Sequence, residues 1–122
     1  MLIEVKAGTI SAWIDREITV GQAEEFYRLQ DTFVESASGE YSRAMRQLRS
    51  MIAIGVERWQ GFEAGADWPG MDCEDDIAAR LAIASKLSIS QAKKISEAIA
   101  ARMHLDDDEE KESAPPFVKS TG

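Results

Sequence analysis

Few side chains in this sequence have both the type and the spacing that catalysis on a substrate requires. His104 is the only histidine, so a general base of the most common kind has a single candidate. The sequence contains no glycine-rich phosphate loop, no G-x-S-x-G motif and no H-E-x-x-H motif. We therefore expect no enzymatic activity, no catalytic residue and no bound cofactor.

Acidic residues cluster in two segments, which raises the question of a metal site. Asp72 and residues 74–76 form one cluster, and residues 106–110 form the other. Neither cluster has the spaced oxygen ligands and the central glycine of an EF-hand loop. The single Cys73 and the single His104 are too few for a structural zinc site. We expect solvated acidic surfaces and no metal, with Asp72 as the N-cap of a helix whose first turn is negatively charged.

Three arginines at a spacing of three residues predict a basic ridge on a helix. Arg43, Arg46 and Arg49 drift slowly around the helix surface and lie beside an apolar stripe. Either they form a solvated flank, or they contact an acidic partner or the acidic C-terminal tail of the chain itself. The net charge of -8 opposes attraction to phosphate, so we expect no binding to nucleic acid.

Three aromatic residues lie among glycines in the segment that follows these arginines. Trp59, Phe62 and Trp68 either cap the core or anchor a protein partner, because aromatic side chains near turns do both. Together with the arginines they make up the candidate partner-binding residues, which are Arg43, Arg46, Arg49, Trp59, Phe62 and Trp68.

Helix-start signals place two of the elements that carry these side chains. Thr19 with Gln22, and Ser88 with Gln91, each form a capping box, in which two side chains satisfy backbone N–H groups at a helix start. The first box opens a helix that ends at the break over residues 36–39. The second box opens the last helix of the chain.

The strongest helical pattern covers residues 41–59, where apolar residues recur every three or four positions. This pattern predicts a long central helix that ends at Trp59. Gly55 lies on the apolar stripe, although glycine costs roughly 1 kcal/mol relative to alanine inside a helix. We therefore expect another element to cross the central helix closely at Gly55.

The chain has 122 residues, which is the size of one domain. We expect residues 1–105 to form an all-α domain, a small bundle of about four helices. Residues 1–17 are its N-terminal arm, either irregular or a small strand pair, because their apolar residues only partly alternate.

Residues 106–122 hold six acids and two lysines without apolar periodicity, so we expect a disordered acidic tail. We expect no membrane segment, because no apolar run approaches the roughly 20 residues that cross a bilayer.

The order of these features along the chain is typical of one protein family. Residues 18–20 open a helix, the long helix ends in residues 56–59, and residues 68–69 (Trp-Pro) precede an acidic helix start. Residues 81–88 and a final amphipathic helix follow. Over residues 18–103 the sequence resembles the tail assembly chaperones of long-tailed bacteriophages.

The resemblance implies a small, acidic, mostly helical protein that binds the tape measure protein and keeps its apolar helices soluble. It also implies recruitment of tail tube subunits during tail morphogenesis in the host bacterial cytoplasm, and absence from the mature virion. Many family members have a longer form made by programmed frameshifting, and codons C-CCU-UUU for residues 115–117 would permit such a slip. Trp68 before Pro69 and the sparse N-terminal segment depart from the family pattern, so no contact residue is carried over.

Two other functions fit the same residues. A structural phage protein, such as a head-tail connector or a minor tail component, would pack its arm and aromatic loop against symmetric neighbours and stay in the virion. An acidic adaptor or inhibitor directed at the host would use its tail to imitate nucleic acid and occupy a basic site. Association of the chain into a homo-oligomer stays open in each case.

Overall fold

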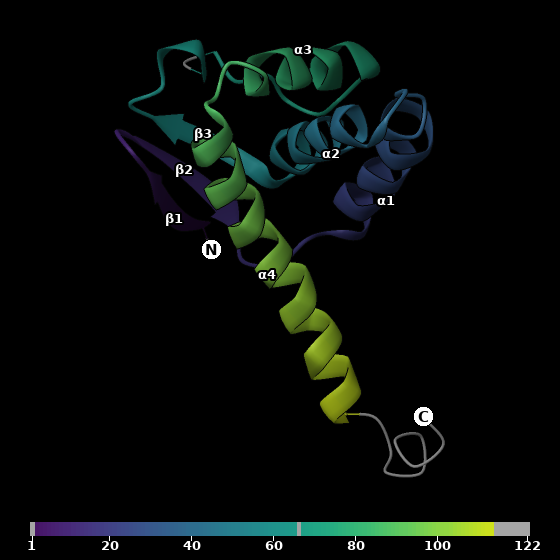
Figure 1. Ribbon diagram of the computed structural model, residues 1–122. Coiled ribbons are helices and arrows are strands. Elements are labelled where there is room, and N and C mark those ends of the chain that lie inside the picture. The colour runs from purple at the N-terminus through teal and green to yellow at the C-terminus, as the bar shows by residue number, and fades with distance from the viewer. Residues whose placement is uncertain (1, 66, 114–122) are drawn as a thin grey trace.

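The computed structural model describes the chain over residues 2–65 and 67–113, with side chains over residues 2–64 and 67–102. The described chain holds a three-stranded antiparallel sheet and four α-helices (Figure 1). In chain order the elements are β1 (Leu2–Ala7), β2 (Ile10–Asp15), α1 (Val20–Leu29), the π-helical segment η1 (Gln30–Val34), α2 (Glu40–Gly55), β3 (Val56–Gln60), the 3-10 turn η2 (Glu63–Gly65), α3 (Glu74–Ala84) and α4 (Ile89–Ser113).

The prediction of an all-α fold is wrong, because the chain forms a mixed α/β domain. The predicted central helix stops at Gly55, and the next residues turn directly into strand β3. β3 pairs antiparallel with β2, with Val56 opposite Ile14 and Trp59 opposite Ala12. The apolar spacing of residues 41–59 fits one face of a helix, but the cross-strand pairing with β2 decides the conformation after Gly55.

The N-terminal end of the predicted domain follows one of the two expected alternatives, a small strand pair, whereas the C-terminal end differs from the expectation. The N-terminal arm is the ordered hairpin β1–β2, closed by a two-residue turn in which Gly8 has φ of 64°. At the other end, α4 continues to Ser113, so residues 106–113 of the tail that we expected to be disordered are helical. Residues 114–122 of the predicted tail lie outside the described residues. No helix in the described part of the chain is long and apolar enough to cross a membrane.

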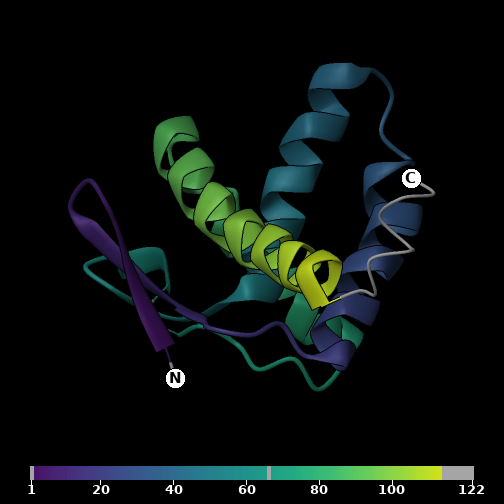
Figure 2. The same ribbon diagram turned by 90° about the horizontal axis from the view of Figure 1, so that it is seen from below.

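The core has two parts that share α2. One part lies between the sheet and α4 and includes Ile14, Ile52 and Ile95. The other lies between α1, α2 and α3 and includes Phe26 and Leu81. Seen from two directions, α4 lies between the β1–β2 hairpin and α1 (Figures 1 and 2). Because α2 contributes residues to both parts of the core, it joins the sheet side of the domain to the α1–α3 side.

Both predicted capping boxes are confirmed. The Gln22 backbone N–H donates to Thr19 Oγ1 at 3.1 Å, and the Thr19 N–H donates to Gln22 Oε1 at 2.9 Å. At the start of α4, Ser88 and Gln91 make the same reciprocal pair, with both distances at 3.2 Å. The predicted N-cap of α3 is wrong by one residue, because α3 begins at Glu74 after Cys73, which makes no side-chain cap.

The close crossing expected at Gly55 is confirmed. A Cβ atom on Gly55 would lie 2.6 Å from Ile99 Cδ1 on α4, which is too close for an ordinary carbon contact. The missing side chain therefore lets α4 approach the end of α2 closely.

We predict that Gly55→Ala lowers the free energy of unfolding by about 1–3 kcal/mol, because the added methyl group overpacks the contact with Ile99. Urea denaturation followed by circular dichroism measures this change. Gly21→Ala is the matched control, because a Cβ on Gly21 meets only Thr19 Oγ1 at 3.9 Å. Ile99→Val should rescue part of the loss, and strictly additive effects of the two substitutions would contradict the steric explanation.

Candidate partner-binding groove

An open apolar groove runs along the first half of α2 and past the start of α4. Its first part has a volume of about 240 Å³ and lies between α2 and the α3–α4 turn. The lining of this part includes Met45, Leu48, Arg49, Leu87, Ile89 and Ala92. Its second part, of about 280 Å³, is lined by Tyr41, Ser42, Met45, Arg46 and Arg49. The two parts share Met45 and Arg49, so we treat them as one surface, the α2–α4 groove.

Helical spacing explains how α2 contributes to this groove. Tyr41, Met45 and Arg49 are four residues apart, so they lie one above the other on a single face of the helix. The other wall depends on the capping box of α4, which sets the helix start and places Ile89 at the first helical position. The groove exposes large apolar side chains, since Tyr41 is 89% exposed and Ile89 is 60% exposed.

Two of the three predicted arginines line the groove, and internal contacts hold both of them. Arg46 Nη1 donates to the Phe33 carbonyl at 2.8 Å and to Ser36 Oγ at 2.9 Å. Arg49 Nε donates to the Leu81 carbonyl at 3.2 Å. Both guanidinium groups lie over the Phe33 ring, at 4.9 Å and 5.1 Å from its centroid. These contacts pin η1 and α3 to α2 while the two cations border the apolar surface.

Arg46 and Arg49 place two positive charges next to each other in the groove. Burial lowers the pKa of Arg49, and the nearby charge of Arg46 lowers it further. Arginine stays protonated at any physiological pH, so the groove keeps two adjacent positive charges. Arg43, the third predicted arginine, is half-buried on α2 and lines neither part of the groove.

The predicted aromatic residues form a cluster in another part of the molecule. Trp59 packs edge-to-face against Phe62, with centroids 5.1 Å apart, and against Trp68, with centroids 5.5 Å apart. All three are partly buried against the sheet side of the core. Trp68 Nε1 donates to the Val56 carbonyl at 2.8 Å. The structure therefore favours the core-capping interpretation for Trp59, Phe62 and Trp68 and does not bring them to the arginines.

A further key residue, Arg80, escaped the sequence analysis. It is only 5% exposed, and its guanidinium lies over the Trp68 ring at 4.8 Å. Its Nε donates to the Pro69 carbonyl at 2.7 Å, and its Nη1 donates to the carbonyls of Ala53 at 2.8 Å and Val56 at 3.2 Å. The available signal was helical spacing, because Arg80 is three residues after Ile77 and four before Ala84, on the buried face of α3.

Burial lowers the pKa of Arg80 overall, and two nearby carboxylates, those of Glu57 and Asp76, offset only part of this effect. Two of the three carbonyls that it contacts, those of Ala53 and Val56, lie at the end of α2, where the helix dipole favours a positive charge. Arg80 is thus a structural cation at a helix end and not a member of a binding site.

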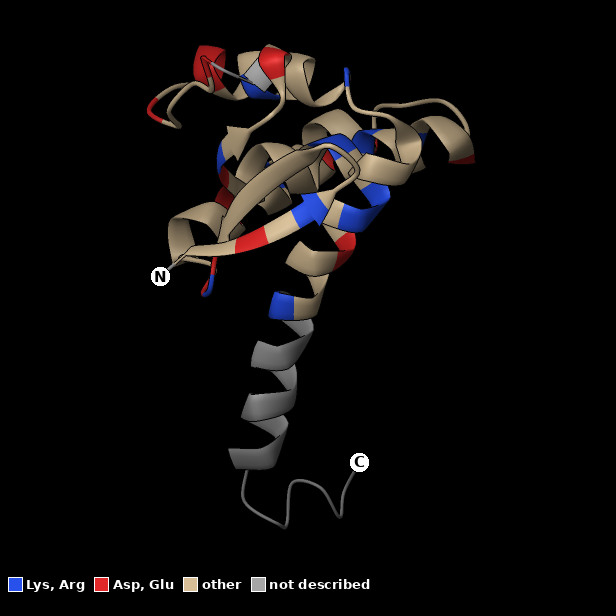
Figure 3. Ribbon diagram, turned by 90° about the vertical axis from the view of Figure 1, so that its left-hand side faces the viewer, with Lys and Arg blue, Asp and Glu red and all other residues tan. Residues whose placement is uncertain are grey.

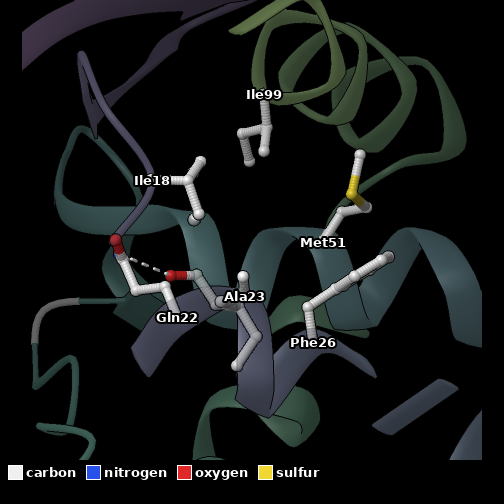
Figure 4. Close-up of a pocket in the computed structure, with 8 residues that line it drawn as sticks. Ile18, Gln22, Ala23, Phe26, Met51 and Ile99 are labelled. Atoms are coloured by element: carbon white, nitrogen blue, oxygen red, sulfur yellow. Dashed lines mark hydrogen bonds between the residues drawn. The ribbon is translucent and has the colours of Figure 1, made fainter. Parts of the chain in front are cut away.

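A second hollow lies where the segment before α1, α1, α2 and α4 meet (Figure 4). Its walls include Ile18, Phe26, Met51 and Ile99, and its volume is about 10 Å³. A space of that size holds about one water molecule. It is a packing defect beside Gly55 and offers no room for a ligand.

Neither a metal-binding cluster nor a similarity to known proteins assigns a function to the groove. Within the described residues, no three His, Cys, Asp or Glu side chains come together in a way that could hold a metal ion. No family model matches the sequence, and no match was found among the curated proteins or the solved structures.

We predict that Arg80→Lys lowers the free energy of unfolding by about 2 kcal/mol. The reason is that lysine lacks the planar guanidinium group that donates to three carbonyls at once. Differential scanning calorimetry measures the change. Arg16→Lys, at an exposed position before α1, is the matched control and should leave stability unchanged. Equal stability of the two variants would show that Arg80 does not hold the end of α2.

Proposed function

We propose that this protein is a tail assembly chaperone of a long-tailed bacteriophage. In this proposal the α2–α4 groove binds an amphipathic helix of the tape measure protein, and the complex recruits tail tube subunits. The observation that carries the proposal is the exposure of Tyr41 and Ile89 in the two adjoining parts of one apolar groove, Tyr41 on α2 and Ile89 at the start of α4. Exposed apolar surface of this kind is typical of sites where another protein binds.

The shape of the groove suits a helix. One wall is a helix face with apolar residues four positions apart, and the other wall is the first turn of α4. An amphipathic helix lays its apolar face into such a groove through residues at similar spacing. The side chains of Met45 and Leu48 would form the floor beneath it.

Charge restricts the partner further. Arg46 and Arg49 are the charged residues that line the groove, although the whole chain has a net charge of -8. The groove therefore fits a helix whose apolar face is bordered by acidic residues. The negative charge over the rest of the surface would keep a complex with an apolar protein dissolved.

The proposal includes a place and a time of action. We place the protein in the host bacterial cytoplasm during tail morphogenesis, with no catalytic role and with no part in the mature virion. The sequence resemblance over residues 18–103 supports this assignment. The programmed frameshift product belongs to the same proposal.

We predict that coexpression with the tape measure protein encoded near this gene increases the soluble fraction of that protein, and that the two copurify. Tyr41→Ala with Ile89→Ser should weaken the complex at least tenfold, a loss of about 1.4 kcal/mol, because both anchors are removed. Pull-down and titration calorimetry with the full chain measure the effect.

The chain offers a matched control for that double variant. Tyr27 and Val20 are also exposed, at 61% and 77%, and Val20 is the first residue of α1 as Ile89 is of α4. Tyr27→Ala with Val20→Ser should bind like the wild type. Equal loss in both double variants would place the binding surface outside the groove, and no copurification at low salt would refute the chaperone function.

We also predict that mass spectrometry of purified phage particles finds this protein absent, because a chaperone leaves the tail when assembly ends. Tail tube and tape measure proteins serve as positive controls in the same sample. Detection at a fixed stoichiometry would support the alternative of a structural head-tail connector or minor tail component.

A further inference from the structure

The strand β1 is the uncovered edge of the sheet. In the order β1-β2-β3, both outer strands have one side without a strand partner among residues 2–65 and 67–113. At the start of β3, the Val56 carbonyl already accepts hydrogen bonds from Trp68 Nε1 and Arg80 Nη1. Figure 3, seen from the β1 side, shows no other part of the described chain in front of β1. The edge of β1 is therefore available to another strand.

The backbone geometry of the hairpin defines which groups face outward. Ala7 pairs with Ile10 across the two-residue turn, so these two residues exchange hydrogen bonds. Alternation along an antiparallel strand then directs the backbone groups of Leu2, Glu4 and Lys6 away from β2. Unpaired N–H and C=O groups along an edge are a template for strand addition.

The side chains of β1 are complementary to those of a second β1. In an antiparallel pair centred on Val5, Glu4 of each copy lies opposite Lys6 of the other, so two pairs of opposite charge form. Moving the register by two residues in one direction places Glu4 opposite Glu4, and in the other direction places Lys6 opposite Lys6. Like charges directly opposite are destabilising, so charge selects the register centred on Val5.

We propose that two copies of this chain associate by antiparallel pairing of their β1 strands, which joins two three-stranded sheets across a twofold axis. Such an axis keeps the same sheet face on the same side in both copies. The half-buried side chains of Ile3 and Val5, which pack against the core on the α4 side, then continue across the junction. The surface uses none of the residues that line the α2–α4 groove, so the inference does not depend on the proposed function.

Charge exchange tests this pairing directly in the full chain. Sedimentation equilibrium should show a monomer–dimer equilibrium for the wild type. Glu4→Lys and Lys6→Glu should each weaken the dimer at least tenfold, because each creates two like-charged pairs. A mixture of the two variants should restore association, since every pair across the junction is then of opposite charge.

A double exchange and two controls complete the design. The chain that carries both Glu4→Lys and Lys6→Glu should dimerise with itself and not with the wild type. Lys94→Glu, on the exposed surface of α4, makes the same change in net charge as Lys6→Glu and should dimerise normally. Circular dichroism verifies that each variant is folded.

Three outcomes would overturn the proposal. They are a wild type that stays monomeric, single variants that dimerise as well as the wild type, and a mixture of the two variants that stays monomeric.

Discussion

The structure depends on the junction at which α2 ends and β3 begins without an intervening loop. A helix end leaves carbonyl groups without intrahelical donors, and here the junction is covered by protein. Arg80 donates to the carbonyls of Ala53 and Val56 from α3, and the amide of Gln22 donates to the Ile54 carbonyl from α1 at 3.2 Å. Side chains from two helices thus satisfy the backbone at one place. This arrangement lets a single segment supply both the central helix and an edge strand of the sheet.

The junction has a consequence for the opposite end of α2. Because the C-terminal half of the helix is buried between the sheet, α3 and α4, the available surface of α2 lies in its first half. Met45 and the exposed Tyr41 lie there, and the contacts of Arg46 and Arg49 with Phe33 hold η1 beside them. The groove is therefore an edge of the core, built on a rigid helix and bordered by cations that are already positioned. A surface of this kind loses little conformational entropy when a partner helix binds.

Local rules made several features of this protein predictable from its residues. Thr19 with Gln22, and the equivalent pair before α4, act through hydrogen bonds that span three residues, so the pattern of letters contains the whole interaction. Gly55 was interpretable because a glycine on an apolar helical stripe has few explanations other than close packing. The spacing of Arg46 and Arg49 correctly predicted that both lie on one helix. It did not predict which residues their side chains contact, because those residues are on other elements.

The sequence by itself determined where helices start, where α2 is crossed closely, and the strong acidic balance of the chain. Only the tertiary structure decided that Val56–Gln60 is a strand, that Arg80 is buried at a helix end, and that Trp59 belongs to the core. These outcomes depend on partners distant in sequence, since β3 needs β2 and Arg80 needs the end of α2. An apolar residue every third or fourth position satisfies a helix face, but a neighbouring strand with unpaired hydrogen-bonding groups outweighs that local preference.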